Sequence, residues 1–301
     1  MNAATRTRAV TTAALLALTL SACSAATGGT DTGRTGGADP GAAAGARTPQ
    51  IRHVHALGVD PADQRLYAAT HDGIFTPGRG GAPERVGDSA DDFMGFTVAG
   101  PKRFLASGHP APGSGGPAHH GLIESRDAGR TWKPLSLRGE ADFHALEHVD
   151  GTLYGYDSTG ARLRVSEDGA AWDDRARLQA LDIAVHPGAP DTVLATTADG
   201  IARSTDGGRT FAAGGEPVMA FLSWAVPGAL YGLDGSGGLH RSTDAGATWE
   251  KAGTVPGGRP QALTAVDAER VLAATGDGVY ESADGGRSFT KRLDVGGGDG
   301  H

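Results

Sequence analysis

The chain repeats one stretch, Ser125-Arg126-Asp127-Ala128-Gly129-Arg130-Thr131-Trp132, and this repetition decides the fold. Three further copies keep the Ser, the Asp, the Gly and a final aromatic residue, at residues 204–211, 242–249 and 282–289. A fifth copy at 166–172 is one residue shorter and lacks the threonine. The aspartates of this Ser-x-Asp motif are Asp127, Asp168, Asp206, Asp244 and Asp284, so the spacings are 41, 38, 38 and 40 residues. A period of about 40 residues is typical of propellers and solenoids.

A second repeated element, a short apolar stretch, precedes each copy and also opens one unit that has no copy. It occupies residues 66–70, 104–107, 153–156, 193–197, 230–233 and 271–275. Each of the six units predicts four short strands separated by Gly and Asp clusters; in the fourth unit these are 181–185, 193–197, 201–204 and a strand from Thr210. Four-stranded units at this spacing are propeller blades. The sequence therefore predicts an all-β, six-bladed β-propeller over residues 51–295, with the motifs as hairpin turns.

The composition agrees with many tight turns rather than long helices. The 301 residues include 49 glycines, and each glycine weakens a helix by about 1 kcal/mol. The formal net charge of −8 argues against nucleic acid as a partner. The only cysteine, Cys23, excludes an intramolecular disulfide framework and a cysteine-rich zinc site.

The N-terminal segment predicts export. Arg6 and Arg8 precede an apolar run over residues 9–20, which is too short to span a bilayer. The following Leu20-Ser21-Ala22-Cys23 resembles a bacterial lipobox, which implies a signal peptide over 1–22 and a lipidated Cys23. The alternative is an ordinary secretory peptide cut after Ala22. We expect a flexible Gly/Ala-rich tether over 23–50, a disordered tail over 296–301, and a lipid anchor at the extracytoplasmic face of the cell membrane.

The Ser-x-Asp motif resembles the Asp-box, or BNR repeat, of sialidases, sortilin-type receptors and photosystem assembly factors. That resemblance implies a propeller in which the five aspartates are structural, since the Asp accepts backbone N–H bonds and the Gly supplies positive φ. The whole chain also resembles bacterial lipoproteins catalogued as sialidase-like glycosyl hydrolases. A sialidase needs three arginines, a Tyr activated by Glu, an acidic Asp and a Phe/Tyr-Arg-Ile-Pro motif. The nearest stretch, Ile51-Arg52-His53, lacks this pattern, so we do not expect a true exo-sialidase.

Unusual residues gather at one predicted end of the channel-lining first strands. Aligning these strands by their apolar pattern gives the leading positions His55, Met94, His144, Leu181, Met219 and Gln261. Strand parity places residues two earlier on the same side, among them His53, Asp92 and Asp142. The second strands of blades 1 and 2 end at His71 and His109 on the same face. An insertion over 111–120 adds His119 and His120.

This cluster predicts a working face on blades 1–3. A set of His55, Met94, His144 and Met219 would suit copper, whereas His and carboxylate ligands would suit zinc. The ligand-binding face would add His53, His71, Asp92, His109 and Asp142. The alternative is that Met94 and Met219 only plug the channel and the histidines are solvated. The alignment assumes no β-bulge, which would move a side chain to the other side.

Three functions remain open at this point. The first is a binding or assembly module, possessing a transition-metal site on this face. The second is a glycoside hydrolase, with Asp92 and Asp142 as the candidate catalytic pair. The third is a purely structural protein-interaction disc. In each case we expect a monomer whose ligand is a glycan or a protein.

Overall fold

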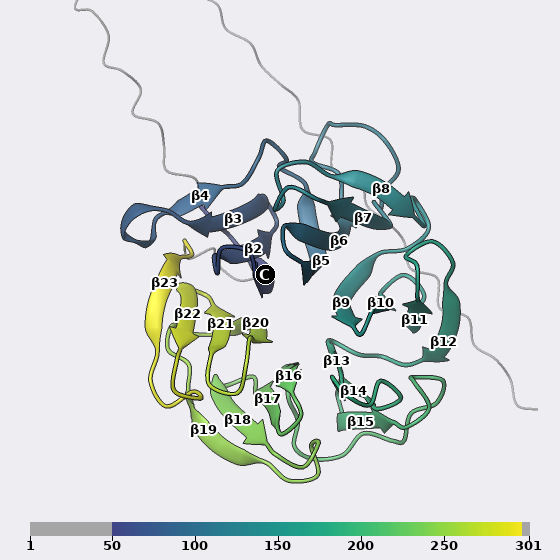
Figure 1. Cartoon of the computed structure of the whole chain (residues 1–301), viewed down its shortest axis with the longest axis vertical. Helices are drawn as coiled ribbons and strands as arrows, with labels where there is room; N and C mark the ends of the chain where they lie inside the picture. The colour runs from purple at the N-terminus through teal and green to yellow at the C-terminus, as the bar shows by residue number, and fades with distance from the viewer. Residues whose placement is uncertain (1–49, 297–301) are drawn as a thin grey trace, which may run out of the picture. The chain divides into compact units, whose positions relative to one another are not determined.

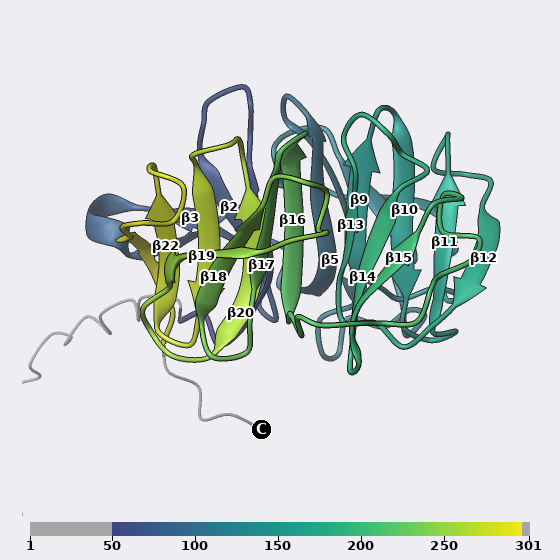
Figure 2. The same ribbon diagram turned by 90° about the horizontal axis from the view of Figure 1, so that it is seen from below.

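Six antiparallel sheets stand in a ring in the computed structural model, which describes residues 50–296 (Figure 1). Each sheet is one blade, and its strands follow one another in chain order from the centre outward. Figure 2 shows the same ring from its edge, with the strands running across its thickness. The predicted all-β, six-bladed β-propeller is confirmed, and the one helical element in the described residues is a short 3-10 turn, η1 (Arg79–Gly81).

The first three blades each contain four strands. Blade 1 comprises β1 (Val54–Val59), β2 (Leu66–Thr70), β3 (Gly73–Pro77) and β4 (Pro83–Arg85). Blade 2 comprises β5 (Asp92–Gly100), β6 (Arg103–His109), β7 (Leu122–Ser125) and β8 (Lys133–Ser136). Blade 3 comprises β9 (Phe143–Val149), β10 (Thr152–Asp157), β11 (Arg162–Ser166) and β12 (Asp173–Arg177).

The other three blades include one exception. Blade 4 comprises only β13 (Ile183–Val185), β14 (Val193–Thr197) and β15 (Gly200–Ser204). Blade 5 comprises β16 (Phe221–Val226), β17 (Ala229–Leu233), β18 (Gly238–Ser242) and β19 (Glu250–Thr254). Blade 6 comprises β20 (Pro260–Ala265), β21 (Val271–Thr275), β22 (Gly278–Ser282) and β23 (Thr290–Asp294).

The predicted fourth strand of blade 4, from Thr210, is wrong. This segment pairs with β15 through an isolated bridge between Ile201 and Gly215 and through one hydrogen bond from Ala212 N–H to the Arg203 carbonyl at 2.9 Å, which together do not make a strand. Gly214, Gly215 and Pro217 follow at that point, and glycine weakens a strand while proline has no N–H to donate to a ladder.

The apolar core lies between neighbouring blades, as the alternation of the strands requires. Tyr67, Tyr154 and Tyr231 occupy one position of the second strands, and all three are buried. The hydroxyl of Tyr231 donates to the Ala268 carbonyl at 2.7 Å, and that of Tyr154 donates to the Pro190 carbonyl at 3.2 Å. These tyrosines therefore pack one blade against the next, as a repeated position predicts.

The Ser-x-Asp motifs form turns that directly follow the third strands of their blades. In the second blade, Thr131 N–H and Thr131 Oγ1–H donate to Asp127 at 2.9 and 2.6 Å, and Gly129 N–H donates to Ser125 Oγ at 2.8 Å. The turns at Asp206, Asp244 and Asp284 repeat these contacts. Asp168, in the short copy, accepts instead from the N–H groups of Ala170 and Ala171. Each aspartate is thus used inside its own turn.

The ring closes between blades 6 and 1 through side chains rather than by strand exchange. In the part of the chain that the structure describes, every sheet contains strands of one contiguous segment. Val54 N–H donates to Gln261 Oε1 at 2.9 Å, and Thr264 Oγ1–H donates to the Leu57 carbonyl at 2.9 Å. One buried cluster joins residues of both blades, including Leu57 and Leu272.

The predicted signal peptide over 1–22, nearly all of the predicted tether with Cys23, and the tail over 297–301 lie outside the described residues. Within residues 50–296, no helix has the length and apolar character needed to cross a membrane.

Candidate functional site

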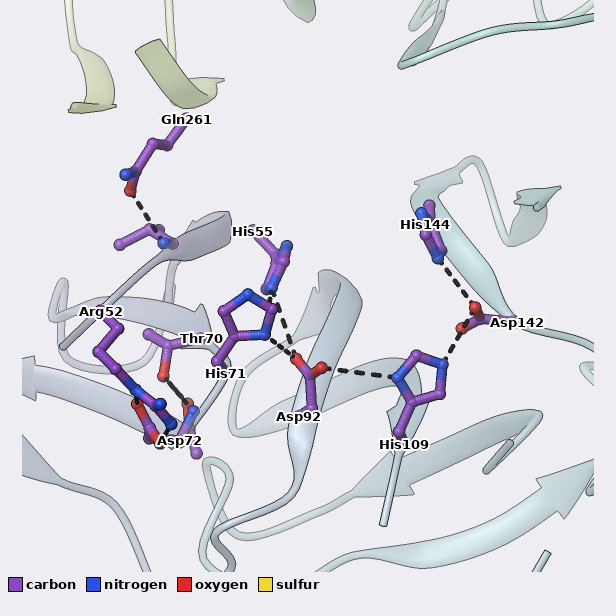
Figure 3. A network of polar contacts seen from close by, with 12 residues as sticks. Arg52, His55, Thr70, His71, Asp72, Asp92, His109, Asp142, His144 and Gln261 are labelled. Atoms are coloured by element: carbon purple, nitrogen blue, oxygen red, sulfur yellow. Dashed lines mark hydrogen bonds and ion pairs between the residues drawn. The ribbon is translucent and has the colours of Figure 1, made fainter. Parts of the chain in front are cut away.

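Histidines and aspartates gather on one face of the propeller, where first strands begin and second strands end. His55 lies near the start of β1, His71 directly follows β2, and Asp92 begins β5. His109 ends β6, and Asp142 directly precedes β9. We call the region formed by His53, His55, His71, Asp92, His109, His119, Asp142 and His144 the histidine face. The sequence prediction that residues of blades 1–3 converge here agrees with these positions (Figure 3).

A β-bulge occurs at the leading position of four first strands, contrary to the assumption in the sequence alignment. The strand register skips His55, Met94, His144 and Gln261. A bulge adds one unpaired residue and turns its side chain away from the regular alternation. The bulges at His55 and His144 lie at the channel mouth, so both rings border the central cavity.

The first close group consists of His55, His71 and Asp92. His55 Nε2 lies 3.2 Å from His71 Nδ1, and His71 Nδ1 lies 2.9 Å from Asp92 Oδ1. The third side of this triangle, from His55 Nε2 to Asp92 Oδ1, is 3.4 Å. Three atoms able to ligate a cation therefore converge on one point.

The second close group consists of His109, His119 and Asp142. Asp142 Oδ2 lies 3.2 Å from His109 Nε2 and 3.9 Å from His119 Nδ1. The same oxygen lies 2.8 Å from His144 Nε2 and accepts from Ser158 Oγ at 3.1 Å. Asp142 Oδ1 and His119 Nδ1 are buried and have no hydrogen-bond partner. This group therefore contains one ligand nitrogen, His119 Nδ1, that the protein itself leaves unpaired.

His109 connects the two groups. Its Nδ1 lies 3.5 Å from Asp92 Oδ2, while its Nε2 lies 3.2 Å from Asp142 Oδ2 (Figure 3). Gly108 permits this approach, because a Cβ at that position would lie 1.9 Å from the Asp92 carbonyl oxygen. The two aspartates are thus joined through one imidazole ring.

The insertion over residues 111–120 is tied down beside this network. His120 N–H donates to the Gly108 carbonyl at 2.8 Å, and Gly139 N–H donates to the His119 carbonyl at 2.9 Å. The Asp91 carboxylate accepts from Ala111 N–H at 2.8 Å and lies 3.2 Å from His120 Nε2. These contacts hold His119 near Asp142.

Burial and hydrogen bonding set the protonation of this face. Burial lowers the pKa of His53 to about 4, aided by His55 and His71, and burial also lowers the pKa of His55. For Asp92 burial opposes ionisation, but hydrogen bonds from His55 and His71 outweigh it and hold the pKa below its ordinary value. The pKa of Asp142 is lowered too, because contacts with His144 and His109 outweigh its burial. At neutral pH the face thus offers the carboxylates of Asp92 and Asp142 together with neutral imidazoles at His53 and His55.

The pKa shifts of the two candidate catalytic carboxyls do not favour the general-acid role in glycoside hydrolysis. Such enzymes require one carboxylic acid that stays protonated, which needs a raised pKa. Asp92 and Asp142 both have lowered pKa values. Neither carboxyl is suited to act as the general acid at neutral pH.

Met219 does not join the histidines, and this corrects the predicted metal set. Met219 precedes β16 and is buried in an apolar cluster with Leu222 and Trp224. In blade 1, Leu57 pairs with Ala68 of β2. The equivalent residue of β17 is Gly232, which pairs with Leu222 rather than with Phe221, so the sequence alignment was displaced by one residue in blade 5. Met94 is half-buried and does not line the central cavity.

The central channel contains two acidic residues that sequence reasoning missed. Glu147 and Asp182 line a cavity of about 550 Å³. Burial and the nearby Asp182 raise the pKa of Glu147 to about 8, and burial raises that of Asp182 to about 7. The sequence did contain a signal for Glu147, because the equivalent position of the other five first strands carries a small, uncharged residue. These residues are Gly58, Thr97, Ala184, Ser223 and Thr264.

No family model matches this sequence, and no curated protein matches it. Solved structures do share its architecture. An ancestral GH74 enzyme matches with a TM-score of 0.52 and 14% identity over 78% of this chain, which spans 36% of that enzyme's length. YCF48 from Cyanidioschyzon merolae matches with a TM-score of 0.52 and 14% identity, covering 79% of this chain and 95% of its own.

Two further matches are similar in extent. Virginiamycin B lyase from Staphylococcus aureus has a TM-score of 0.54 and 12% identity, covering 77% of this chain and 83% of its own. A structure of YCF48 bound to D1 peptide has a TM-score of 0.53 and 13% identity, covering 79% and 92%. At these identities the likeness shows the β-propeller fold alone, and that fold serves both enzymes and peptide binding.

Proposed function

We propose that this protein is a tethered, extracytoplasmic binding module whose histidine face holds a transition-metal ion. The convergence of His55, His71 and Asp92 supports this best, since the three ligand atoms lie 2.9–3.4 Å apart. Zinc binds imidazole nitrogen at about 2.0 Å, which places tetrahedral ligands about 3.3 Å from one another. The triangle therefore has nearly the dimensions of one face of a tetrahedral site before any ion enters.

The donor set favours a divalent ion. Zn²⁺ and Cu²⁺ both accept imidazole nitrogen and carboxylate oxygen, whereas Cu⁺ prefers thiolate and thioether ligands. Met219 is enclosed in an apolar cluster and Met94 does not line the channel. Of the two metals expected from the sequence, zinc thus gains support, and copper remains supported only in its divalent form.

We propose further that Cys23 carries the lipid anchor and that the propeller is a monomer exposed outside the cell membrane. The lipobox-like Leu20-Ser21-Ala22-Cys23 and the Asp-box-like turns together support an extracytoplasmic Asp-box lipoprotein. Labelling of cells with a radioactive fatty acid should mark the native protein and leave the Cys23→Ser variant unmarked. Equal labelling of both proteins would contradict the anchor.

The metal proposal is tested by metal content. The purified full-length protein is loaded separately with Zn²⁺ and Cu²⁺, freed of loosely bound ions, and measured by mass spectrometry. We expect about one equivalent or more to be retained, and the His55→Ala/His71→Ala variant to retain less.

The matched control is His240→Gln. His240 pairs with Asp234 at 2.9 Å in blade 5, outside the histidine face, and belongs to neither close group. This variant should keep the native metal content. Absence of retained zinc and copper in the unaltered protein would overturn the proposal.

A further inference from the structure

We propose that the histidine face holds two metal ions in adjacent sites, coupled through His109. This inference rests on the proposed function and adds the number of ions and the relation between them. Site A comprises His55, His71 and Asp92; site B comprises His109, His119 and Asp142. In each site, the three ligand atoms lie within 4.8 Å of one another.

Site B has its own evidence for a cation. The Asp142 side chain is only 6% exposed, yet its Oδ1 atom has no hydrogen-bond partner. His119 Nδ1 is likewise buried without a partner. A buried donor or acceptor is normally paired, and such exceptions require an explanation. A cation between His119 Nδ1 and the Asp142 carboxylate, whose Oδ2 lies 3.9 Å from that nitrogen, would give the unpaired His119 atom a partner, and a carboxylate that binds the ion through both oxygens would pair Oδ1 as well.

The geometry of His109 separates the two ions. Its Nε2 faces Asp142, whereas its Nδ1 faces Asp92 from the other edge of the ring. An ion ligated by Nε2 lies about 2.0 Å from that nitrogen, on the Asp142 side. Asp92 directs Oδ1 toward His55 and His71, and Oδ2 toward His109. One ion at the meeting point of site A therefore cannot also occupy the Nε2 side of His109.

The same geometry couples the sites. A histidine that ligates metal usually donates its other N–H to a carboxylate, which orients the ring and makes it a better ligand. Asp92 Oδ2 faces His109 Nδ1 at 3.5 Å, and a small shortening of this distance on metal binding would let the ring N–H donate to the carboxylate. Asp92 is thus a ligand in site A and a positioning residue for site B.

Zinc stoichiometry and affinity, measured by calorimetry and mass spectrometry on the full-length protein, test the proposal. We expect two equivalents in the native protein and one each in His55→Ala/His71→Ala and His119→Ala/Asp142→Asn. His240→Gln should retain two. Asp92→Ala should retain one, bound 10–100-fold more weakly than the single ion of His55→Ala/His71→Ala. Both variants lack site A, so the difference isolates the effect of Asp92 on site B.

The possible failures are distinguishable. One equivalent in the native protein would overturn the two-site proposal while leaving the proposed function in place, and no zinc would overturn both. Equal affinities in Asp92→Ala and His55→Ala/His71→Ala would overturn the coupling. Circular dichroism shows whether each variant folds; where an alanine variant does not, the same counts are taken on His55→Gln/His71→Gln and His119→Gln/Asp142→Asn.

Discussion

The two faces of this propeller use similar residues in opposite ways. On the face of the Ser-x-Asp turns, each aspartate is occupied within its own turn, as Asp127 is by Thr131. On the histidine face, Asp92 and Asp142 instead meet side chains from neighbouring blades. The first arrangement recurs five times along the chain, whereas the second is confined to blades 1–3. Repeated residues here build blades, and departures from the repeat build the site.

Among the variants that test this difference between the two faces, Gly108→Ala is expected to have the largest effect. The added Cβ would lie 1.9 Å from the Asp92 carbonyl oxygen, so β5 and β6 must separate where Asp92 and His109 meet. We expect a loss of about 3 kcal/mol in the free energy of unfolding, together with loss of bound metal. Urea unfolding and metal content measure the two effects. Gly235→Ala is the matched control, since its Cβ would meet no atom within 4 Å; equal results for both variants would contradict the argument.

Glu147→Gln tests the channel that joins the two faces. The folded-state pKa of Glu147 is raised to about 8, so folding is penalised increasingly as pH rises above the ordinary value of 4.5, and fully above pH 8. The variant should therefore be more stable than the native protein by about 2 kcal/mol at pH 9 and equally stable at pH 4. This gain in stability is smaller than the free energy equivalent to the full pKa shift, because the Glu147 side chain faces an open channel and solvent screens its charge. Urea unfolding at both pH values checks it, and a gain of the same size at pH 4 would show another cause.

Ser204→Ala tests whether a Ser-x-Asp turn contributes to stability without affecting the histidine face. Ser204 is buried, and its Oγ accepts from Gly208 N–H at 2.8 Å. Losing this acceptor should cost about 1–2 kcal/mol of stability. Metal content should not change, because the turn lies on the opposite face. Thr205→Ala, an exposed position in the same turn, should be neutral; reduced metal in the Ser204 variant would show that the faces are not independent.

The sequence was sufficient to predict the blades, because the motifs that indicate them are local and repeated. The Ser-x-Asp motif predicts a turn from residues that contact one another within the same turn, as at Asp206. Blade 4 shows the limit of this reasoning: its motif ends normally at Phe211, but the following glycines and Pro217 prevent a full fourth strand.

The site could be predicted only in part. Placing His55, His71 and Asp92 on one face required only strand direction. Predicting which of these side chains contact one another required the pairing register of the strands. A displacement of one residue before β16 was enough to assign Met219 wrongly to the channel. The bulge at His144 and the tethering of His119 depend on backbone contacts that no spacing in the sequence expresses.

The closure of the ring makes its starting point arbitrary. Each blade is encoded by an uninterrupted piece of chain, and blades 6 and 1 meet through side chains such as Gln261. At this seam, a Cβ placed on Gly296 would lie 3.6 Å from the Cβ of Gln50. A short peptide could therefore join these two points, and new ends could be opened between blades 4 and 5 without dividing any sheet. Such a circular permutant would move the chain ends to the half of the ring farther from the histidines, while the order of blades around the axis stayed the same.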